Sequence, residues 1–399
     1  MNIGVLTYHC VPNFGAQLQA ISTIGYLKAK GITPYILNWI PNDLEDMYKK
    51  RIPEDQFREH IRFASQYMPL SKLCRTETDI ISEVKKLKID AIITGSDALF
   101  KYIPQVCRND TKPLSVEDLE GNAFWGKFLS NLSVKAIAFS VSCQNTQYQK
   151  INSTEKTQLK QNLAHYSKIS VRDEWTKKMV EKITKRKDVF TSPDPVFAFN
   201  KNCYLEIPTK EEIQQKFNLP SKYILFSFRT NHLPNEYICQ LSTSFVEQGI
   251  TPVALPMPEC LKKYNIERLI TQPLSPLDWY AIIKYSLGYV GERMHPIVVA
   301  LHNSIPFFSF DEYGFFKTYF FNHFKKYIAT SSKTFQLLDK AGLKEYYYSY
   351  NNPKTKLPSI STIINQIKNF PISRCTQFAK NSENNYLDAM NYMLNELVN

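Results

Sequence analysis

The chain has 399 residues, which is too long for one small core and makes two domains the expectation. Apolar residues make up 43% and charged residues 22%, as in ordinary globular proteins. Lys and Arg number 49 against 37 Asp and Glu, so the net charge is +12 and anionic partners are favoured. The basic residues form short scattered clusters without a recognised motif, so we expect no nucleic-acid binding.

The eight cysteines lie far apart and include no Cys-x-x-Cys pair, so the sequence predicts neither a metal site nor a cofactor. Apolar runs reach neither the length of a signal peptide at the N-terminus nor the roughly 18 residues of a membrane span. We therefore expect a cytoplasmic protein with reduced thiols. The positive charge also allows peripheral contact with an anionic membrane at its inner face.

Short apolar runs alternate with amphipathic helical stretches, which is typical of parallel α/β sheets. In the first half, strands are expected at Ile3–Tyr8, Pro34–Trp39, Ala91–Thr94, Val134–Val141 and Ile169–Val171. Helices are expected at Gly15–Lys30, within Asp43–Lys88, at Ser153–Tyr166 and at Asp173–Ile183. The prolines on both sides of Asp194 interrupt this series, and we interpret Asp194 as part of a turn.

A second series of the same kind follows residue 200. Its expected strands are Tyr223–Phe228, Thr251–Leu255, Leu287–Val290 and Pro306–Phe310. Its expected helices are Glu236–Glu247, Asp278–Ser286 and Pro296–His302, and a last helix is expected at Cys375–Asn399. We therefore predict two Rossmann-like domains facing a cleft, at residues 1–205 and 206–372, with a helix at 373–399 that packs back across their junction.

The segment from Gly291 to Pro296 is the most informative stretch of the chain. Proline suits the first helical position and biases the preceding residue, His295, toward an extended conformation. In an extended turn, residues two apart project to the same side, so Arg293 and His295 are expected to converge. An anion held between them at a helix N-terminus would fit this arrangement, because Arg grips phosphate or carboxylate and His can transfer a proton.

Ligands of open α/β sheets bind beyond the carboxyl ends of the strands, so the loops after the strands are the candidate site. Arg229 ends an otherwise apolar strand, where a charge requires a partner or a ligand. Arg172 favours a local ion pair with Asp173 and Glu174, with ligand binding as the alternative. The candidate substrate-binding residues in these loops are His9, Asn13, Gly15, Ser96, Asp97, Arg172, Asn231 and Glu292.

Taken together, these loops resemble the polysaccharide pyruvyl transferases. The resemblance rests on Thr7-Tyr-His, Asn13-Phe-Gly-Ala-x-Leu-Gln-Ala20, Gly95-Ser-Asp97, Ser170-Val-Arg172, Asp194-Pro-Val196, Arg229 and Gly291-x-Arg-x-His295, and covers residues 1 to about 310. The sequence departs from the family pattern at Ala98 and Phe100, where Gln and Trp are usual, and at Met294, where Leu is common. The first two departures lie near the expected acceptor side. They therefore affect the expected identity of the acceptor sugar more than that of the donor.

The resemblance implies a fold similar to the GT-B glycosyltransferases and a reaction that uses phosphoenolpyruvate. The pyruvyl unit would pass to two hydroxyls of a cell-surface glycan precursor, which a lipid pyrophosphate could carry, and form a cyclic ketal. By similarity, Arg229, Arg293 and His295 hold the donor, and His295 is the acid that protonates its methylene carbon. His9, Asp97 or Glu292 would accept the hydroxyl protons.

Two other functions compete with this hypothesis. A nucleotide-sugar glycosyltransferase of GT-B type would need a base and ribose pocket in the second half, and no acidic pair is convincingly placed there. A glycan-binding relative that has lost catalysis would keep the fold, and the change at Ala98 is compatible with it.

Overall fold

The computed structural model describes residues 1–108, 114–229, 232–259, 266–312, 314–319 and 324–398. Its core elements are two six-stranded sheets, and every strand pair in both is parallel. The two-domain α/β expectation is therefore confirmed. The first sheet has the order β2 (Thr33–Ile36), β1 (Asn2–Leu6), β3 (Ala91–Thr94), β4 (Lys135–Val141), β5 (Lys168–Val171) and β6 (Phe190–Thr191).

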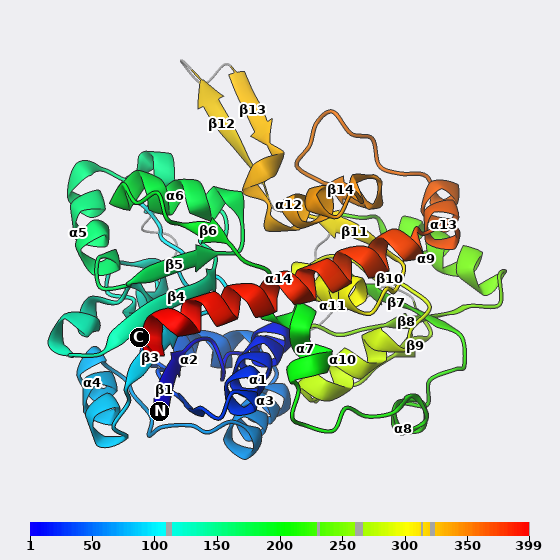
Figure 1. Ribbon diagram of the computed structural model, residues 1–399. Helices are drawn as coiled ribbons and strands as arrows, with labels where there is room; N and C mark the ends of the chain where they lie inside the picture. Colours follow the sequence, from blue (N-terminus) through cyan, green and yellow to red (C-terminus); the bar gives the residue numbers. More distant parts are fainter. Residues whose placement is uncertain (109–113, 230–231, 260–265, 313, 320–323, 399) are drawn as a thin grey trace.

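Helices cover both sheets (Figure 1). Those of the first half are α1 (Phe14–Ala29), α2 (Asn42–Arg51), α3 (Glu54–Tyr67), α4 (Glu77–Lys86), α5 (Ser153–Leu163), α6 (Glu174–Thr184) and α7 (Phe199–Asn202). Two short 3-10 turns matter for the site, η2 (Val116–Asp118) and η6 (Pro195–Ala198). Helix α1 is buried from Phe14 to Leu27, because it lies between the two halves.

The second sheet has the order β14 (Tyr347–Ser349), β11 (Phe307–Asp311), β10 (Tyr289–Gly291), β7 (Tyr223–Ser227), β8 (Thr251–Ala254) and β9 (Arg268–Leu269). Its helices are α8 (Lys210–Lys216), α9 (Asn235–Val246), α10 (Pro276–Lys284), α11 (Met294–His302), α12 (Lys333–Lys340) and α13 (Ile360–Lys368). An antiparallel hairpin of β12 (Phe315–Tyr319) and β13 (Phe324–Ile328) projects from the body (Figure 1).

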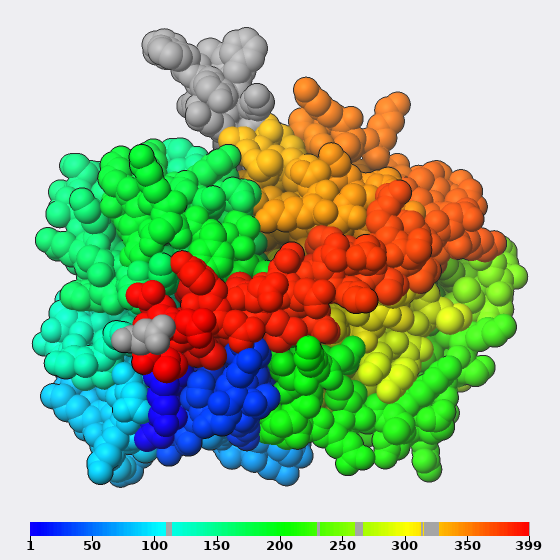
Figure 2. Space-filling model, in the orientation of Figure 1, coloured from blue at the N-terminus to red at the C-terminus, as the bar shows by residue number. Residues whose placement is uncertain are grey.

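The long last helix, α14 (Ile372–Val398), packs against both halves of the molecule. It contacts α11 of the second half and β4 and η6 of the first, and the space-filling view shows it lying across their junction (Figure 2). Its own residues Tyr386, Met390 and Met393 are buried in the core that the two halves share. Within the described residues, no helix has the length and apolar character that crossing a membrane requires.

Direct contacts also join the halves without α14. The rings of Phe14 and Trp279 stack with their centroids 5.2 Å apart. The Gln56 side chain donates to the Leu274 carbonyl at 2.9 Å and accepts from its N–H at 2.7 Å. Each of these contacts pairs one residue of the first half with one of the second. They therefore hold the two halves together directly.

The structure departs from the sequence prediction mainly at short elements. The edge strands β6, β9 and β14 have only two or three residues, too few to show a hydrophobic period, and were not predicted. The hairpin and helices α12 and α13 were also missed. Helix α11 begins at Met294, so the prediction that Pro296 opens this helix and that His295 is extended is wrong.

We predict that Gly25→Ala destabilises the protein, because a Cβ atom there would lie 1.7 Å from the carbonyl oxygen of Asn202. The methyl would force α1 away from α7, at a cost of about 1–3 kcal/mol or more, whereas the gain in helix propensity is only about 1 kcal/mol. The urea midpoint of unfolding measures the net effect. Gly121→Ala is the matched control, since its nearest contact would be Val116 Cγ2 at 3.6 Å, and an equal midpoint for both variants would contradict the prediction.

Candidate functional site

The strand order of the sheets decides which loops meet in the cleft. Each sheet reverses its order at one pair of neighbours, β1 and β3 in the first and β7 and β10 in the second. Connections leave such a pair in opposite directions and open a crevice at the carboxyl ends of the strands. The loops after these four strands carry Asn13, Asp97, Arg229 and Arg293, and all four residues line one cavity.

This cavity, which we call the charged cavity, has a volume of about 270 Å³ and is lined by residues of both halves. Its walls hold more cations than carboxylates, so it attracts small anions. The five cations are Arg51, Lys101, Arg229, Arg293 and Lys333, and the three carboxylates are Asp97, Glu117 and Glu259.

His295 contributes the imidazole of the charged cavity. Its Nε2 is buried and forms no hydrogen bond with any described residue, so it can bind a ligand atom without breaking a protein contact. The ring lies directly against Gly15, where a Cβ atom would approach His295 Cγ to 2.1 Å. Burial lowers the pKa of His295 to about 4, although Asp97 and Asp194 attract its charged form. With only protein groups around it, the ring is neutral near pH 7.

Arg293 and His295 reach the cavity by a different backbone route from the predicted one. His295 lies in the first turn of α11, and Arg293 precedes the helix with φ 86° and ψ 144°. A non-glycine residue in this region costs on the order of 1–3 kcal/mol, and such residues cluster at functional sites. Both residues line the charged cavity, and the backbone there has a positive φ at Arg293 instead of the predicted extended His295.

Both arginines also contact carboxylates of the second half. Arg229 Nη2 pairs with Glu312, and Arg293 Nη2 pairs with Glu259. A guanidinium has five N–H donors in a fork, so one carboxylate contact does not saturate it. A dianionic phosphate or a carboxylate in the charged cavity would compete for or share these donors.

Glu292 has a positioning role. Its carboxylate is buried; Oε2 accepts from the backbone N–H of Arg229 at 3.0 Å, and Oε1 accepts from the Tyr350 hydroxyl at 3.0 Å. Glu292 therefore links the ends of β7 and β10, from which the two arginines emerge. It is not among the described residues that line the charged cavity.

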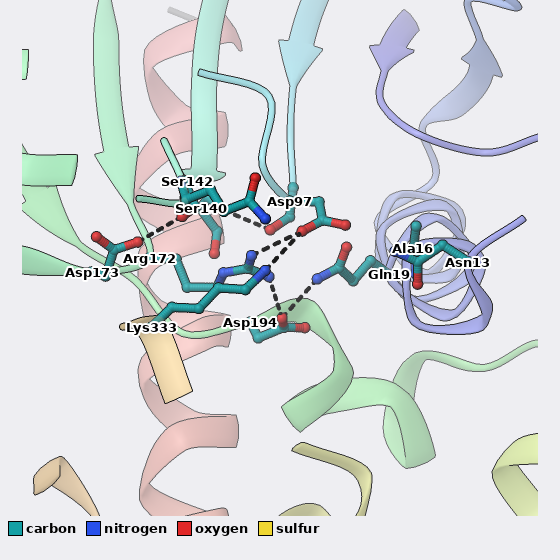
Figure 3. A network of polar contacts seen from close by, with 12 residues as sticks. Asn13, Ala16, Gln19, Asp97, Ser140, Ser142, Arg172, Asp173, Asp194 and Lys333 are labelled. Carbon is teal, nitrogen blue, oxygen red and sulfur yellow. Dashed lines mark hydrogen bonds and ion pairs between the residues drawn. The ribbon is translucent and has the colours of Figure 1, made fainter. Parts of the chain in front are cut away.

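A buried ion network lies beside the cavity (Figure 3). Arg172 Nη2 donates to Asp97 at 2.9 Å and Nη1 donates to Asp194 at 2.6 Å. Gln19 of α1 donates to the same Asp194 oxygen at 2.7 Å, and Lys333 Nζ lies 3.9 Å from Asp97. Because Lys333 comes from α12, the network joins the first sheet to the second half.

The network sets the charge state of Asp97. Burial favours the neutral acid, but the charges of Lys333, His295 and Arg172 together hold the pKa of Asp97 well below its usual range. Burial likewise disfavours the charged form of Arg172. The attraction of Asp194 and Asp97 outweighs this effect of burial, so the pKa of Arg172 is raised. Asp97 therefore presents a permanent carboxylate to the cavity.

Two interpretations of single residues require correction. Arg172 does not pair with Asp173 or Glu174; it lies between Asp97 and Asp194, and its side chain is only 4% exposed. Asp173 instead caps α6 by accepting from the Thr176 N–H at 2.7 Å. Asp194 does accept from Val196 N–H in a turn, but it is also a buried partner of the network.

Other predicted residues lie outside the charged cavity. His9 is buried with Nε2 2.8 Å from Asn38 Oδ1 and Nδ1 3.0 Å from the Thr7 carbonyl oxygen. Ser96 donates to the Ser140 carbonyl at 2.5 Å within the first sheet. Asn231 lies outside the described residues.

Two of the three departures from the family pattern, Phe100 and Ala98, differ in their consequences. Phe100 is fully buried and stacks on Trp125 with centroids 4.8 Å apart, so this change belongs to the core. Ala98 lines the charged cavity directly, so the shorter side chain enlarges the space next to Asp97.

A second cavity adjoins the first and is mainly apolar. It has a volume of about 250 Å³, is bounded by α2, α3 and the ends of β1 and β2, and includes His9. Tyr8, Val11 and Tyr48 line both cavities. Among the described residues, no group of three or more His, Cys, Asp or Glu side chains is placed to hold a metal ion.

Lys333 is one of the cavity residues that sequence reasoning missed. It opens α12 behind the capping residue Ser332, whose hydroxyl accepts from the Phe335 N–H at 3.2 Å. A Ser followed by an amphipathic stretch is a recognisable helix start. Lys333 was missed because it does not follow a predicted strand, and only the loops after strands were considered as the site.

Two parallel α/β halves with a cation-rich cavity between them form a GT-B-like architecture. Residues 13–312 match the family model described as polysaccharide pyruvyl transferase. The match covers most of the chain, and the protein belongs to this family. No curated protein sequence matches it.

Solved structures support the fold. The UDP-GlcNAc 2-epimerase from Neisseria meningitidis bound to UDP-GlcNAc is 10% identical with a TM-score of 0.56, and the alignment covers 99% of this chain and 100% of that one. The spinosyn forosaminyltransferase SpnP is 10% identical with a TM-score of 0.52 over 100% of both chains. At this identity the likeness concerns the fold alone.

We predict that Asp194→Ala lowers the free energy of unfolding by about 3–5 kcal/mol, because it leaves the buried Arg172 without one of its two carboxylates. Chemical denaturation measures the change. Asp188→Ala is the control: Asp188 pairs with Arg186 but is 47% exposed, so a loss below about 1 kcal/mol is expected. Equal losses in both variants would contradict a stabilising role for the network.

We also predict that Gly15→Ala reduces pyruvyl transfer by about 10²-fold without unfolding the protein, because the new methyl must displace the His295 ring. The measurement is the transfer rate, with circular dichroism to verify folding. Gly121→Ala should retain the rate of the unmodified protein. A Gly15→Ala enzyme of normal activity would show that the position of His295 is unimportant.

Proposed function

We propose that this protein transfers the pyruvyl group of phosphoenolpyruvate to two hydroxyls of one sugar in a polysaccharide precursor and forms a cyclic ketal. Membership of the polysaccharide pyruvyl transferase family supports polysaccharide pyruvylation in general. The observation that carries the finer proposal is that Arg229, Arg293 and His295 line a single cavity, while His295 Nε2 has no hydrogen-bond partner among the described residues.

The electrostatics of the cavity support phosphoenolpyruvate as the donor. The molecule carries about three negative charges on a phosphate and a carboxylate, groups that arginine forks bind in bidentate fashion. Arg229 and Arg293 are the proposed clamp, with Lys333 as a third cation on the side of Asp97. Binding of such an anion would raise the low pKa of His295 and charge the ring at the moment the proton is needed.

The proposed reaction begins with proton transfer from His295 to the methylene carbon of phosphoenolpyruvate, which makes the adjacent enol carbon electrophilic. The first sugar hydroxyl adds to that carbon and loses its proton. The bond from that carbon to the phosphate oxygen then breaks, and the second hydroxyl adds and closes the ketal. Of the two hydroxyl protons, one replaces the proton used to form the methyl group and the other leaves with the phosphate.

The remaining expectations concern the acceptor and the location. A lipid-pyrophosphate-linked sugar and a peripheral contact with the inner face of the membrane are suggested by the net charge of +12 and stay predictions, as does the cytoplasmic location. Turnover of UDP- or GDP-sugars in place of phosphoenolpyruvate would favour the glycosyltransferase alternative. Binding of glycans without any turnover would favour the non-catalytic one.

We predict that phosphoenolpyruvate binding is coupled to proton uptake by His295. The pKa of the ring is about 4 in the protein and rises on binding, so affinity should increase as the pH falls from neutrality toward that value. Calorimetry in buffers of different ionisation enthalpy counts the protons taken up. His295→Gln should abolish this uptake and lower acceptor-dependent phosphate release by about 10²–10⁴-fold.

His302→Gln is the matched control for this experiment. His302 lies at the other end of α11, is half-buried, and its pKa is also lowered to about 4, mainly by desolvation. The control variant should retain both the proton uptake and the rate of phosphate release. Uptake that persists in His295→Gln would assign the proton to another group.

A further inference from the structure

Glu117 is a carboxyl group of the charged cavity that no sequence motif indicated. It lies in the 3-10 turn η2 of the first half, on the side of the cavity that also holds Asn13 and Lys101. The residue is only 7% exposed. The hydroxyl of Tyr8, from the end of β1, donates to Glu117 Oε2 at 2.6 Å and fixes the orientation of the carboxyl group.

The other candidate proton acceptors are committed to different contacts. Both ring nitrogens of His9 have hydrogen-bond contacts, and His9 lines the apolar cavity. Asp97 is held by Arg172 and Lys333 with a depressed pKa, which makes it a poor base. Glu292 orients the backbone of Arg229.

Glu259, the third carboxylate of the charged cavity, pairs with Arg293 on the second-half side. Glu117 is thus the carboxyl group on the first-half side that is oriented by a neutral donor, the Tyr8 hydroxyl. Lys101 Nζ is 3.9 Å from Glu117 Oε1 and only 2.5 Å from the neighbouring Asp118, so the lysine is engaged mainly elsewhere.

We infer that Glu117 accepts the proton of the sugar hydroxyl that adds first, with Tyr8 as its positioning residue. This inference rests on the proposed function. As the oxygen–carbon bond forms, the O–H electrons remain on the sugar oxygen and the proton moves to Glu117. When the phosphate departs, Glu117 returns that proton to the phosphate, and the second hydroxyl reprotonates His295 as the ketal closes.

The environment of Glu117 suits a group that gains and loses a proton in each cycle. Burial raises its pKa, the charge of Lys101 opposes that rise, and Asp118 and Asp43 reinforce it. A carboxyl group whose pKa moves toward neutrality is a stronger base than an ordinary one and also a competent acid. The two carboxylates are thus suited to different roles. Glu117, with its raised pKa, can carry a proton, whereas Asp97, with its depressed pKa, stays charged.

The test is acceptor-dependent phosphate release from phosphoenolpyruvate, measured across pH for the unmodified protein, Glu117→Gln, Tyr8→Phe and Glu120→Gln. Glu117→Gln should lower kcat by about 10²–10⁴-fold and leave calorimetric phosphoenolpyruvate binding unchanged. Tyr8→Phe should lower kcat less and shift the acidic limb of the pH profile, because the carboxyl group loses a donor. Glu120→Gln, a control on the same segment that pairs with Arg108 at 3.1 Å, should match the unmodified protein.

Failure of the inference and failure of the proposed function give different results. If the unmodified protein releases phosphate but Glu117→Gln keeps its kcat within about threefold, the inference is wrong and the proposed function stands. If Glu117→Gln does not fold, an unshifted pH profile in Tyr8→Phe overturns the inference instead. An unmodified protein that binds phosphoenolpyruvate and never turns it over overturns both.

Discussion

The pairing of Arg172 with two buried carboxylates is the interaction on which the site depends. Asp97 follows β3, Asp194 precedes η6, and the guanidinium between them pairs with both; all three residues are buried. Charges buried in this way are tolerated only when they are paired and hydrogen-bonded. Gln19 and Lys333 complete the set, so helix α1 and the second half both depend on the same cluster.

The cluster also organises the electrostatics of the neighbouring cavity. It fixes Asp97 as a carboxylate beside His295, whose pKa burial has lowered to about 4. The imidazole is therefore neutral near pH 7, and under the proposed function an anion between Arg229 and Arg293 would charge it. Glu117 of the same cavity is held by the Tyr8 hydroxyl instead of this cluster, and burial raises its pKa.

Much of the fold, and the meeting of Arg229 and Arg293 in one cavity, followed from the sequence for physical reasons. Parallel strands buried on both faces appear as apolar runs, and the carboxyl ends of such strands meet, so Arg229 and Arg293 were found together. Lys333 and Glu117 follow no strand: one opens a capped helix and the other lies in a 3-10 turn. Arg172 was misassigned because the nearest charges in sequence were not the nearest in space.

Helix α14 has a consequence for how substrates gain access. It spans both halves, and its Tyr386 and Met390 are fully buried in the shared core. A hinge motion wide enough to part the sheets would peel this helix from one of them and hydrate those side chains, in addition to separating Phe14 from Trp279. Entry and exit are therefore expected to proceed through local rearrangement of loops at the mouth of the cleft, while the two sheets keep a constant separation through the catalytic cycle.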